Sequence, residues 1–217
     1  MSNLIRAVIW DLDGVIIDSA EAHCKAWYRL AKDLGVPYSD AQFWSTFGQR
    51  NDAIIPTLAG PVSPERSKEL ADRKEAYFRQ FVRETISPLP GAIELLSALR
   101  DAGYRQALAS STPAANIELI SSVLGLGRYL SALVSGEAVP RGKPAPDVFL
   151  RAAVELETEP PCCLVIEDAV AGIEAARAGG MYSIAVAGER DLPGLRAADL
   201  VVRDLTEVTV ERIRELA

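Results

Sequence analysis

Short apolar runs bounded by turn residues alternate along most of this chain with longer stretches of helical periodicity, and this alternation constrains the fold more than any other feature. Such alternation is typical of βα units, whose strands lie parallel in one sheet that the helices cover. The sequence therefore predicts an α/β fold with a Rossmann-like parallel sheet. The expected strands are Arg6–Trp10, Arg105–Ala109, Leu133–Val134, Cys162–Ile166, Ser183–Val186 and Leu200–Val202.

Proline, glycine and threonine mark the helices of this α/β part. Thr112 followed by Pro113 predicts a helix start, because a threonine side chain can cap free N–H groups and proline suits the first turn. The expected helices run from Pro90 to Gly103, from Pro113 to Leu124, from Asp147 to Leu156 and from Ala169 to Ala178.

The stretch from Ala20 to Val82 interrupts the alternation, because it holds helical segments and no convincing strand. A helical insertion directly after the first strand predicts a small helical cap domain set into the α/β core. We assign residues 18–87 to the cap and residues 1–17 and 88–217 to the core. Trp27 and Trp44 are expected in the apolar core of the cap. Its helices are expected over Ala20–Leu34, Ala41–Phe47, Asp52–Leu58 and Ser63–Phe81.

The charge balance excludes several classes of partner. The 217 residues include 23 Lys and Arg against 30 Asp and Glu, a formal net charge of −7. Phosphate backbones and anionic lipid attract clustered positive charge, so we expect no nucleic-acid and no membrane partner. No apolar run approaches the ~20 residues that cross a bilayer, and the three cysteines lack metal-ligand spacing. We expect a cytoplasmic protein with reduced cysteines, as a monomer or weak dimer.

Two carboxylates follow the first expected strand. Asp11 and Asp13 are two residues apart, so in an extended chain their side chains point to the same side, and Gly14 lets the backbone turn. Ligands of open α/β sheets bind at the carboxyl ends of the strands, where these acids lie. Their mutual repulsion favours a divalent cation with oxygen ligands, most simply Mg²⁺. The alternative is an acidic surface turn.

Hydroxyl-bearing and charged residues lie at the ends of other predicted strands as well. Ser110 and Ser111 follow the second strand and precede a helix, where hydroxyls and free N–H groups can bind phosphate. Lys143 lies in a stiff loop, next to Gly142 and followed by two prolines that restrict the backbone. A lysine held in such a loop suits a fixed phosphate charge better than a mobile lysine does. Glu167 and Asp168 follow a further strand. Acids, hydroxyls and one ammonium are therefore predicted at one edge of the sheet.

This combination resembles the haloacid dehalogenase superfamily of phosphotransferases. The motifs that carry the resemblance occur in the family's order and span essentially the whole chain: Asp11-Leu12-Asp13-Gly14-Val15, Ser110, Lys143-Pro144 and Glu167-Asp168. The resemblance implies a phosphoric monoester hydrolase that acts on a small phosphorylated metabolite through an aspartyl phosphate.

The resemblance also implies a role for each residue. Asp11 would be the nucleophile and Asp13 the general acid and base. Ser110, Ser111 and Lys143 would bind the phosphoryl oxygens. Mg²⁺ would be held by Asp11, the backbone carbonyl of Asp13, Glu167 and Asp168.

The helical insertion is similar to the cap of the group that contains β-phosphoglucomutase and many small-metabolite phosphatases. That similarity implies substrate contacts for His23, Arg50 and Lys74 of the cap, with His23 assisting Asp13. Ala114 stands where the mutase has a polar substrate-contacting side chain. This difference counts against a plain mutase. The expected enzyme is therefore a phosphatase of a small phosphorylated metabolite, and the expected metabolite is a sugar phosphate.

Two alternatives stay open at this point. A phosphomutase of the β-phosphoglucomutase kind would keep water away from the aspartyl phosphate until a sugar hydroxyl accepts the phosphoryl group. A non-catalytic phospho-aspartate signalling domain also gathers acids, a hydroxyl and a lysine on an α/β sheet. The signalling domain would explain neither the helical insertion nor the acid Asp13.

Overall fold

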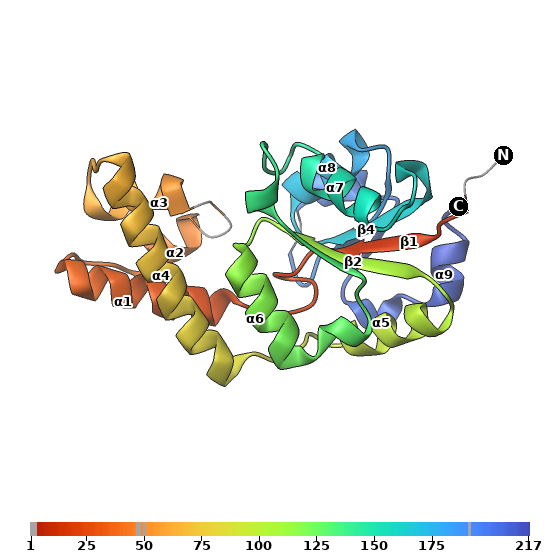
Figure 1. Ribbon diagram of the computed structural model, residues 1–217, viewed down its shortest axis with the longest axis horizontal. Coiled ribbons are helices and arrows are strands. Elements are labelled where there is room, and N and C mark those ends of the chain that lie inside the picture. Colours follow the sequence, from red (N-terminus) through yellow and green to blue (C-terminus); the bar gives the residue numbers. More distant parts are fainter. Residues whose placement is uncertain (1–3, 47–48, 50, 191) are drawn as a thin grey trace. The chain divides into compact units, whose positions relative to one another are not determined.

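The chain forms two compact units. The computed structural model describes residues 4–46, 49, 51–190 and 192–217 (Figure 1). Met1–Asp18 and Ser87–Ala217 form the sheet unit, and Ser19–Ile86 form the helical unit. Each of these boundaries lies one residue from a boundary predicted from the sequence.

The sheet unit is built on six parallel strands in the order β3-β2-β1-β4-β5-β6. The predicted parallel α/β sheet is therefore confirmed. The two strands at its centre, β1 and β4, are buried along their whole length, which explains why their sequences are continuously apolar up to the final acid of β4. The strands are β1 (Ala7–Trp10), β2 (Arg105–Ser110), β3 (Ala132–Ser135), β4 (Cys163–Glu167), β5 (Tyr182–Val186) and β6 (Leu200–Val202).

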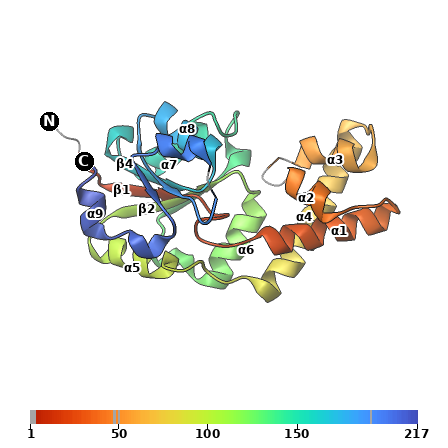
Figure 2. The ribbon, with the colours of Figure 1, turned by 180° about the vertical axis from the view of Figure 1, so that it is seen from behind.

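Helices cover both faces of this sheet (Figures 1 and 2). Helices α7 (Asp147–Glu155) and α8 (Val170–Ala178) pack on one face, where Phe149 and Ala176 join a buried apolar cluster with β1, β2 and β4. The other face carries α5 (Ala92–Asp101), α6 (Ala114–Leu124) and α9 (Val210–Arg214). Short 3₁₀ turns lie at Leu126–Arg128, Gly136–Ala138, Pro160–Cys162, Pro193–Ala197 and Leu205–Glu207.

The register of the strands determines which side chains meet at the carboxyl edge. Trp10 of β1 pairs with Ile166 of β4, so the residues that follow them, Asp11 and Glu167, emerge side by side. The indole N–H of Trp10 donates to the side chain of buried Gln106 at 3.1 Å. This bond ties the last residue of β1 to β2.

The helical unit contains α1 (Ala20–Leu34), α2 (Asp40–Thr46), α3 (Asn51–Ala59) and α4 (Pro64–Thr85). Trp27 lies in its apolar core, as predicted. The prediction for Trp44 was wrong, since this side chain is 62% exposed. Helix α2 is short and buries only Phe43, and the neighbouring position on a helix points about 100° away from the buried side.

Among the described residues, no helix combines the length and the apolar composition that a bilayer span requires.

Candidate active site

The candidate site is built at the carboxyl ends of the central strands. The backbone N–H of Asp11 donates to the carbonyl of Ile166 at 2.9 Å, which extends the pairing of β1 and β4 by one residue. Asp11 is 5% exposed and Glu167 is 1% exposed. Two carboxylates are thus held next to each other in a nearly dry position, where they need a counter-charge.

Lys143 supplies that charge. Its Nζ lies 2.6 Å from Asp11 Oδ1 and 2.6 Å from Glu167 Oε1, and 4.7 Å from the centre of the Phe149 ring. Burial by itself lowers the pKa of the Lys143 ammonium, but Asp11 and Glu167 together outweigh burial and raise this pKa above its ordinary value. The lysine is therefore held as an ammonium between the two acids.

The other oxygen of Glu167 organises the following loop. Glu167 Oε2 accepts hydrogen bonds from the backbone N–H groups of Asp168 and Ala169, at 2.7 and 2.6 Å. A side chain at Gly172 would place its Cβ 1.9 Å from Glu167 Oε1. Gly172 is thus required for Glu167 to take this position, from which it orients both Lys143 and the loop.

Asp168 lies against the first acidic loop. Its Oδ2 would be 2.2 Å from a Cβ at Gly14, whose φ of +79° already favours glycine. Burial is the largest effect on the Asp168 carboxyl and, together with Glu167, raises its pKa to about 6 against the opposing effect of Arg190. Burial likewise raises the pKa of Asp11 well above its ordinary value, against Lys143. Both acids are in a site that disfavours their negative charge when no further cation is bound.

Three of the acids could hold a metal ion. Asp11, Glu167 and Asp168 each offer a ligand atom, and these atoms lie within 4.8 Å of one another. Carboxylate oxygens are the ligands that Mg²⁺ prefers, and a divalent cation would stabilise the charge of the two acids whose pKa values are raised. The residues present therefore fit such an ion. The carboxylate of Asp13 does not belong to this group.

Asp13 is instead fixed by a hydroxyl. Thr112 Oγ1 donates to Asp13 Oδ2 at 2.7 Å, across 99 positions of the sequence. The prediction that Thr112 caps the following helix was wrong, because α6 begins at Ala114 with Pro113 at its N-cap.

The backbone N–H of Thr112 donates to Ser110 Oγ at 3.2 Å. Ser110 is buried and Ser111 is exposed, so the two serines predicted to bind phosphate have different surroundings.

The predicted substrate residues of the insertion fall in the helical unit. Lys74 is only 2% exposed, and its Nζ lies 2.8 Å from His23 Nδ1 and 2.8 Å from Glu75 Oε1. Asn51 donates to the same Glu75 oxygen at 2.8 Å. His23 and Lys74 are therefore brought together in one polar network, in which His23 is half-buried and Lys74 and Glu75 are buried. Arg50 lies outside the described residues.

We expect the His23 ring to stay neutral in mildly acidic solution. The ring stacks on Phe78 with centroids 4.0 Å apart, and burial first and Lys74 second lower its pKa well below the ordinary 6.5. The unfolded chain therefore binds a proton that the folded protein does not. The free energy of unfolding should fall as pH decreases below about 6.5, by at most about 1.4 kcal/mol per pH unit.

His23 is the one histidine of the chain, so a single ring signal in an NMR titration measures this effect directly. Urea unfolding at pH 7 and pH 5.5 should show the loss of stability. In His23→Gln the loss between these two pH values should be smaller. A ring that titrates near 6.5 in the folded protein would contradict the expectation.

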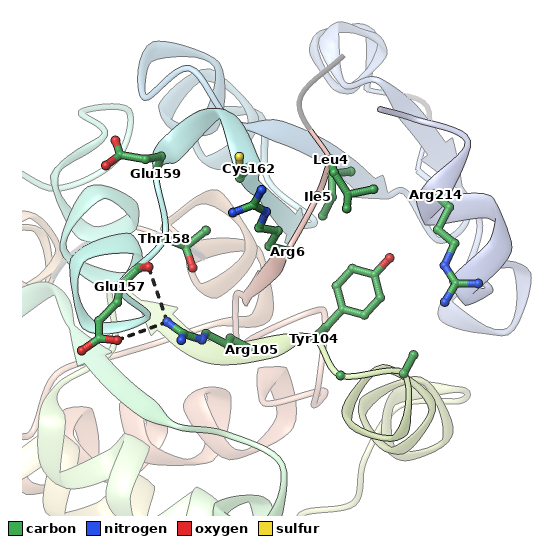
Figure 3. A pocket seen from close by; sticks show the side chains of 12 residues that line it. Leu4, Ile5, Arg6, Tyr104, Arg105, Glu157, Thr158, Glu159, Cys162 and Arg214 are labelled. Atoms are coloured by element: carbon green, nitrogen blue, oxygen red, sulfur yellow. Dashed lines mark hydrogen bonds and ion pairs between the residues drawn. The ribbon is translucent and has the colours of Figure 1, made fainter. Parts of the chain in front are cut away.

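A separate pocket of about 520 Å³ lies at the opposite, amino edge of the sheet. Figure 3 shows Arg6, Tyr104, Arg105 and Arg214 around it. Arg105 Nη1 donates to the carbonyl of Leu156 at 2.6 Å and pairs with the carboxylate of Glu157 at 3.3 Å. The pocket contains none of the residues predicted to act in catalysis.

Two features of the site were missed by reasoning from sequence. The bond from Thr112 to Asp13 was missed because the local pattern favoured a helix cap. Arg190, whose Nη2 lies 3.0 Å from Asp168 Oδ2, follows β5 in a turn with no distinctive motif. A signal that could have drawn attention to Arg190 is its place after a strand end, where the other site residues lie.

Comparisons with known proteins show the family to which this fold belongs. The family model of the haloacid dehalogenase-like hydrolases matches residues 5–180. The chain is 33% identical to β-phosphoglucomutase of Bacillus subtilis, over 97% of this chain and 95% of that protein. It is 32% identical to hexitol phosphatase A of Escherichia coli, over 95% and 94% respectively. A solved hydrolase from Entamoeba histolytica superposes with a TM-score of 0.89 at 27% identity, over 98% of this chain and 99% of that one.

Proposed function

The chain belongs to the haloacid dehalogenase-like hydrolases, and we propose that it is a Mg²⁺-dependent phosphatase of a small phosphorylated metabolite, most simply a sugar phosphate. The members of this family that are similar to the chain include a phosphatase and a phosphomutase. The observation that carries the proposal is the position of Lys143, 2.6 Å from both Asp11 and Glu167 at the carboxyl edge of the central strands. A fixed positive charge beside a buried carboxylate suits the transfer of an anionic group to that carboxylate.

In the proposed reaction Asp11 attacks the phosphorus atom and forms an aspartyl phosphate. Asp13 protonates the leaving oxygen and then removes a proton from the attacking water. The Thr112 hydroxyl donates to Asp13 Oδ2, which holds the carboxyl of Asp13 in place. Lys143, Ser110 and Ser111 bind the phosphoryl oxygens and stabilise the charge of the transition state.

The proposed metal ligands are Asp11, the backbone carbonyl of Asp13, Glu167 and Asp168. Bound there, Mg²⁺ would supply positive charge to the phosphoryl oxygens and to Asp11. Glu167 already binds Lys143 and two backbone N–H groups through its two oxygens. Its proposed part is therefore to contact the ion through water or to hold Asp168 in place.

The helical unit is the proposed cap that selects the substrate, with His23, Arg50 and Lys74 as its substrate-binding residues. The three cysteines are unpaired, which is consistent with our proposal that the protein works in the reducing cytoplasm.

A phosphomutase is the second candidate, favoured by the 33% identity to β-phosphoglucomutase of Bacillus subtilis. The two reactions differ in what takes the phosphoryl group from Asp11, which is water in a phosphatase and a sugar hydroxyl in a mutase. Free phosphate and isomerised sugar phosphate should be measured in the same reaction, with and without a sugar bisphosphate. We expect free phosphate as the main product.

A screen of phosphorylated metabolites tests the function itself. The intact chain should release phosphate from one or a few sugar or polyol phosphates with Mg²⁺, and chelation by EDTA should stop the release. Asp11→Asn, prepared in parallel, identifies activity from contaminating phosphatases. Failure to turn over any phosphate ester, with Mg²⁺ present and the fold intact, would contradict the proposal.

A further inference from the structure

Arg190 is held against the acidic group by several fixed contacts. Its Nη2 lies 3.0 Å from Asp168 Oδ2 and 3.1 Å from the Asp168 backbone carbonyl. The same atom lies 3.2 Å from the carbonyl of Val186, and Nε donates to the carbonyl of Ala187 at 3.2 Å. The backbone on both sides of the guanidinium therefore determines where its charge lies.

This arginine completes the charge pairing of the three acids that could hold a metal ion. Lys143 contacts Asp11 and Glu167, and Arg190 contacts the third acid, Asp168. The Asp168 side chain is 16% exposed, whereas that of Arg190 is 46% exposed. Asp168 is thus the acid whose counter-charge comes from the rim of the site, where the charge of the arginine is partly solvated.

We propose that Arg190 is the counter-ion of Asp168 in the metal-free protein and that it weakens the binding of a divalent cation to the acidic group. This inference rests on the proposed function, because it takes Asp168 as a metal ligand. A positive charge fixed within hydrogen-bond distance of a ligand repels an incoming cation. The hydrogen bond from Arg190 also occupies one carboxylate oxygen of Asp168.

A purely structural role for Arg190 leads to the opposite expectation. If the arginine only tied the turn after β5 to Asp168, its removal would loosen Asp168 and weaken metal binding. If it acts as a counter-ion, its removal strengthens metal binding. The sign of the change therefore separates the two roles.

The test measures metal affinity without turnover. Free Mn²⁺, an ion with the same preference for oxygen ligands, is followed by electron paramagnetic resonance, with Mg²⁺ as competitor. Arg190→Gln removes the charge and retains hydrogen-bond donors, and we expect it to bind both ions about three- to tenfold more tightly in about 0.1 M salt. The difference should shrink in about 1 M salt, because it comes from charge.

Two matched variants complete the experiment. Arg190→Lys keeps the positive charge and should bind the ions as the intact chain does. Arg177→Gln makes the same charge change at an exposed residue in the last turn of α8, and it should leave the affinity unchanged. Circular dichroism establishes that each variant is folded.

An Arg190→Gln variant that binds the ions as weakly as the intact chain, or more weakly, overturns the inference. So does an Arg190→Lys variant that binds as tightly as Arg190→Gln. Absence of binding to the intact chain, or undiminished binding to Asp168→Asn, would overturn the proposed metal site as well. Failure of the inference alone is therefore distinguishable from failure of the proposed function.

Discussion

Asp11→Asn abolishes phosphate release, with turnover reduced by about four orders of magnitude or more, because the amide cannot form the covalent intermediate. The substitution changes the shape of the side chain very little. It also removes a buried carboxyl whose pKa burial has raised, and Lys143 keeps Glu167 as its partner. The free energy of unfolding should therefore not decrease. Phosphate release, circular dichroism and thermal unfolding measure these effects, and weak binding of inorganic phosphate should persist.

Asp101→Asn is the matched control for this variant. Asp101 ends α5 and pairs with Arg100 at 2.8 Å, with its side chain 64% exposed. The same chemical change there should leave turnover and stability as they are. Substantial activity of Asp11→Asn above that of a mock purification would remove Asp11 from the role of nucleophile.

Lys143→Met should have the second largest effect, on both stability and activity. The methionine leaves Asp11 and Glu167 without the ammonium that lies 2.6 Å from each. Removing one partner of a buried ion pair typically costs about 3–5 kcal/mol. Turnover should fall by at least about three orders of magnitude, because both the phosphoryl oxygens and Asp11 lose a fixed positive charge.

The pH dependence of this variant gives a further measurement. Burial raises the pKa of Asp11 and Lys143 opposes that rise. Without the ammonium the pKa of Asp11 should rise further, so folding takes up a proton that the unfolded chain does not bind at neutral pH. The stability deficit of Lys143→Met relative to the intact chain should therefore be smaller at pH 5 than at pH 7. Urea unfolding at the two pH values measures the difference.

Lys68→Met is the control for Lys143→Met. Lys68 pairs with Asp72 at 3.2 Å on α4, where the two side chains are 79% and 70% exposed. An exposed pair of this kind contributes little, so no clear loss of stability or activity is expected. Lys143→Met with unchanged stability at pH 7 would contradict the electrostatic account of the site.

Most of the sheet unit and the position of the site could be predicted from sequence. The buried central strands are continuously apolar, and the carboxyl ends of parallel strands meet at one edge by topology alone. For this reason Asp11, Lys143 and Glu167, which are far apart in the sequence, were predicted at the same place. The order of the motifs was enough to identify the family.

Features that depend on tertiary contacts were not predictable in this way. Thr112 has the pattern of a helix cap, and only the folded chain brings its hydroxyl to Asp13. Trp44 lies in a helix too short for its periodicity to indicate which side is buried. Arg190 is one of many arginines until the turn after β5 places it against Asp168.

Detection of the covalent intermediate tests the central claim, that Asp11 accepts the phosphoryl group, most directly. Asp13→Asn cannot activate water, but the leaving group of p-nitrophenyl phosphate needs no proton, so the aspartyl phosphate should form in this variant and accumulate. After a rapid acid quench, borohydride converts an acyl phosphate of aspartate into homoserine, which mass spectrometry locates in the sequence. We predict homoserine at position 11, and its appearance at another acid, or turnover without it at any position, would contradict the account.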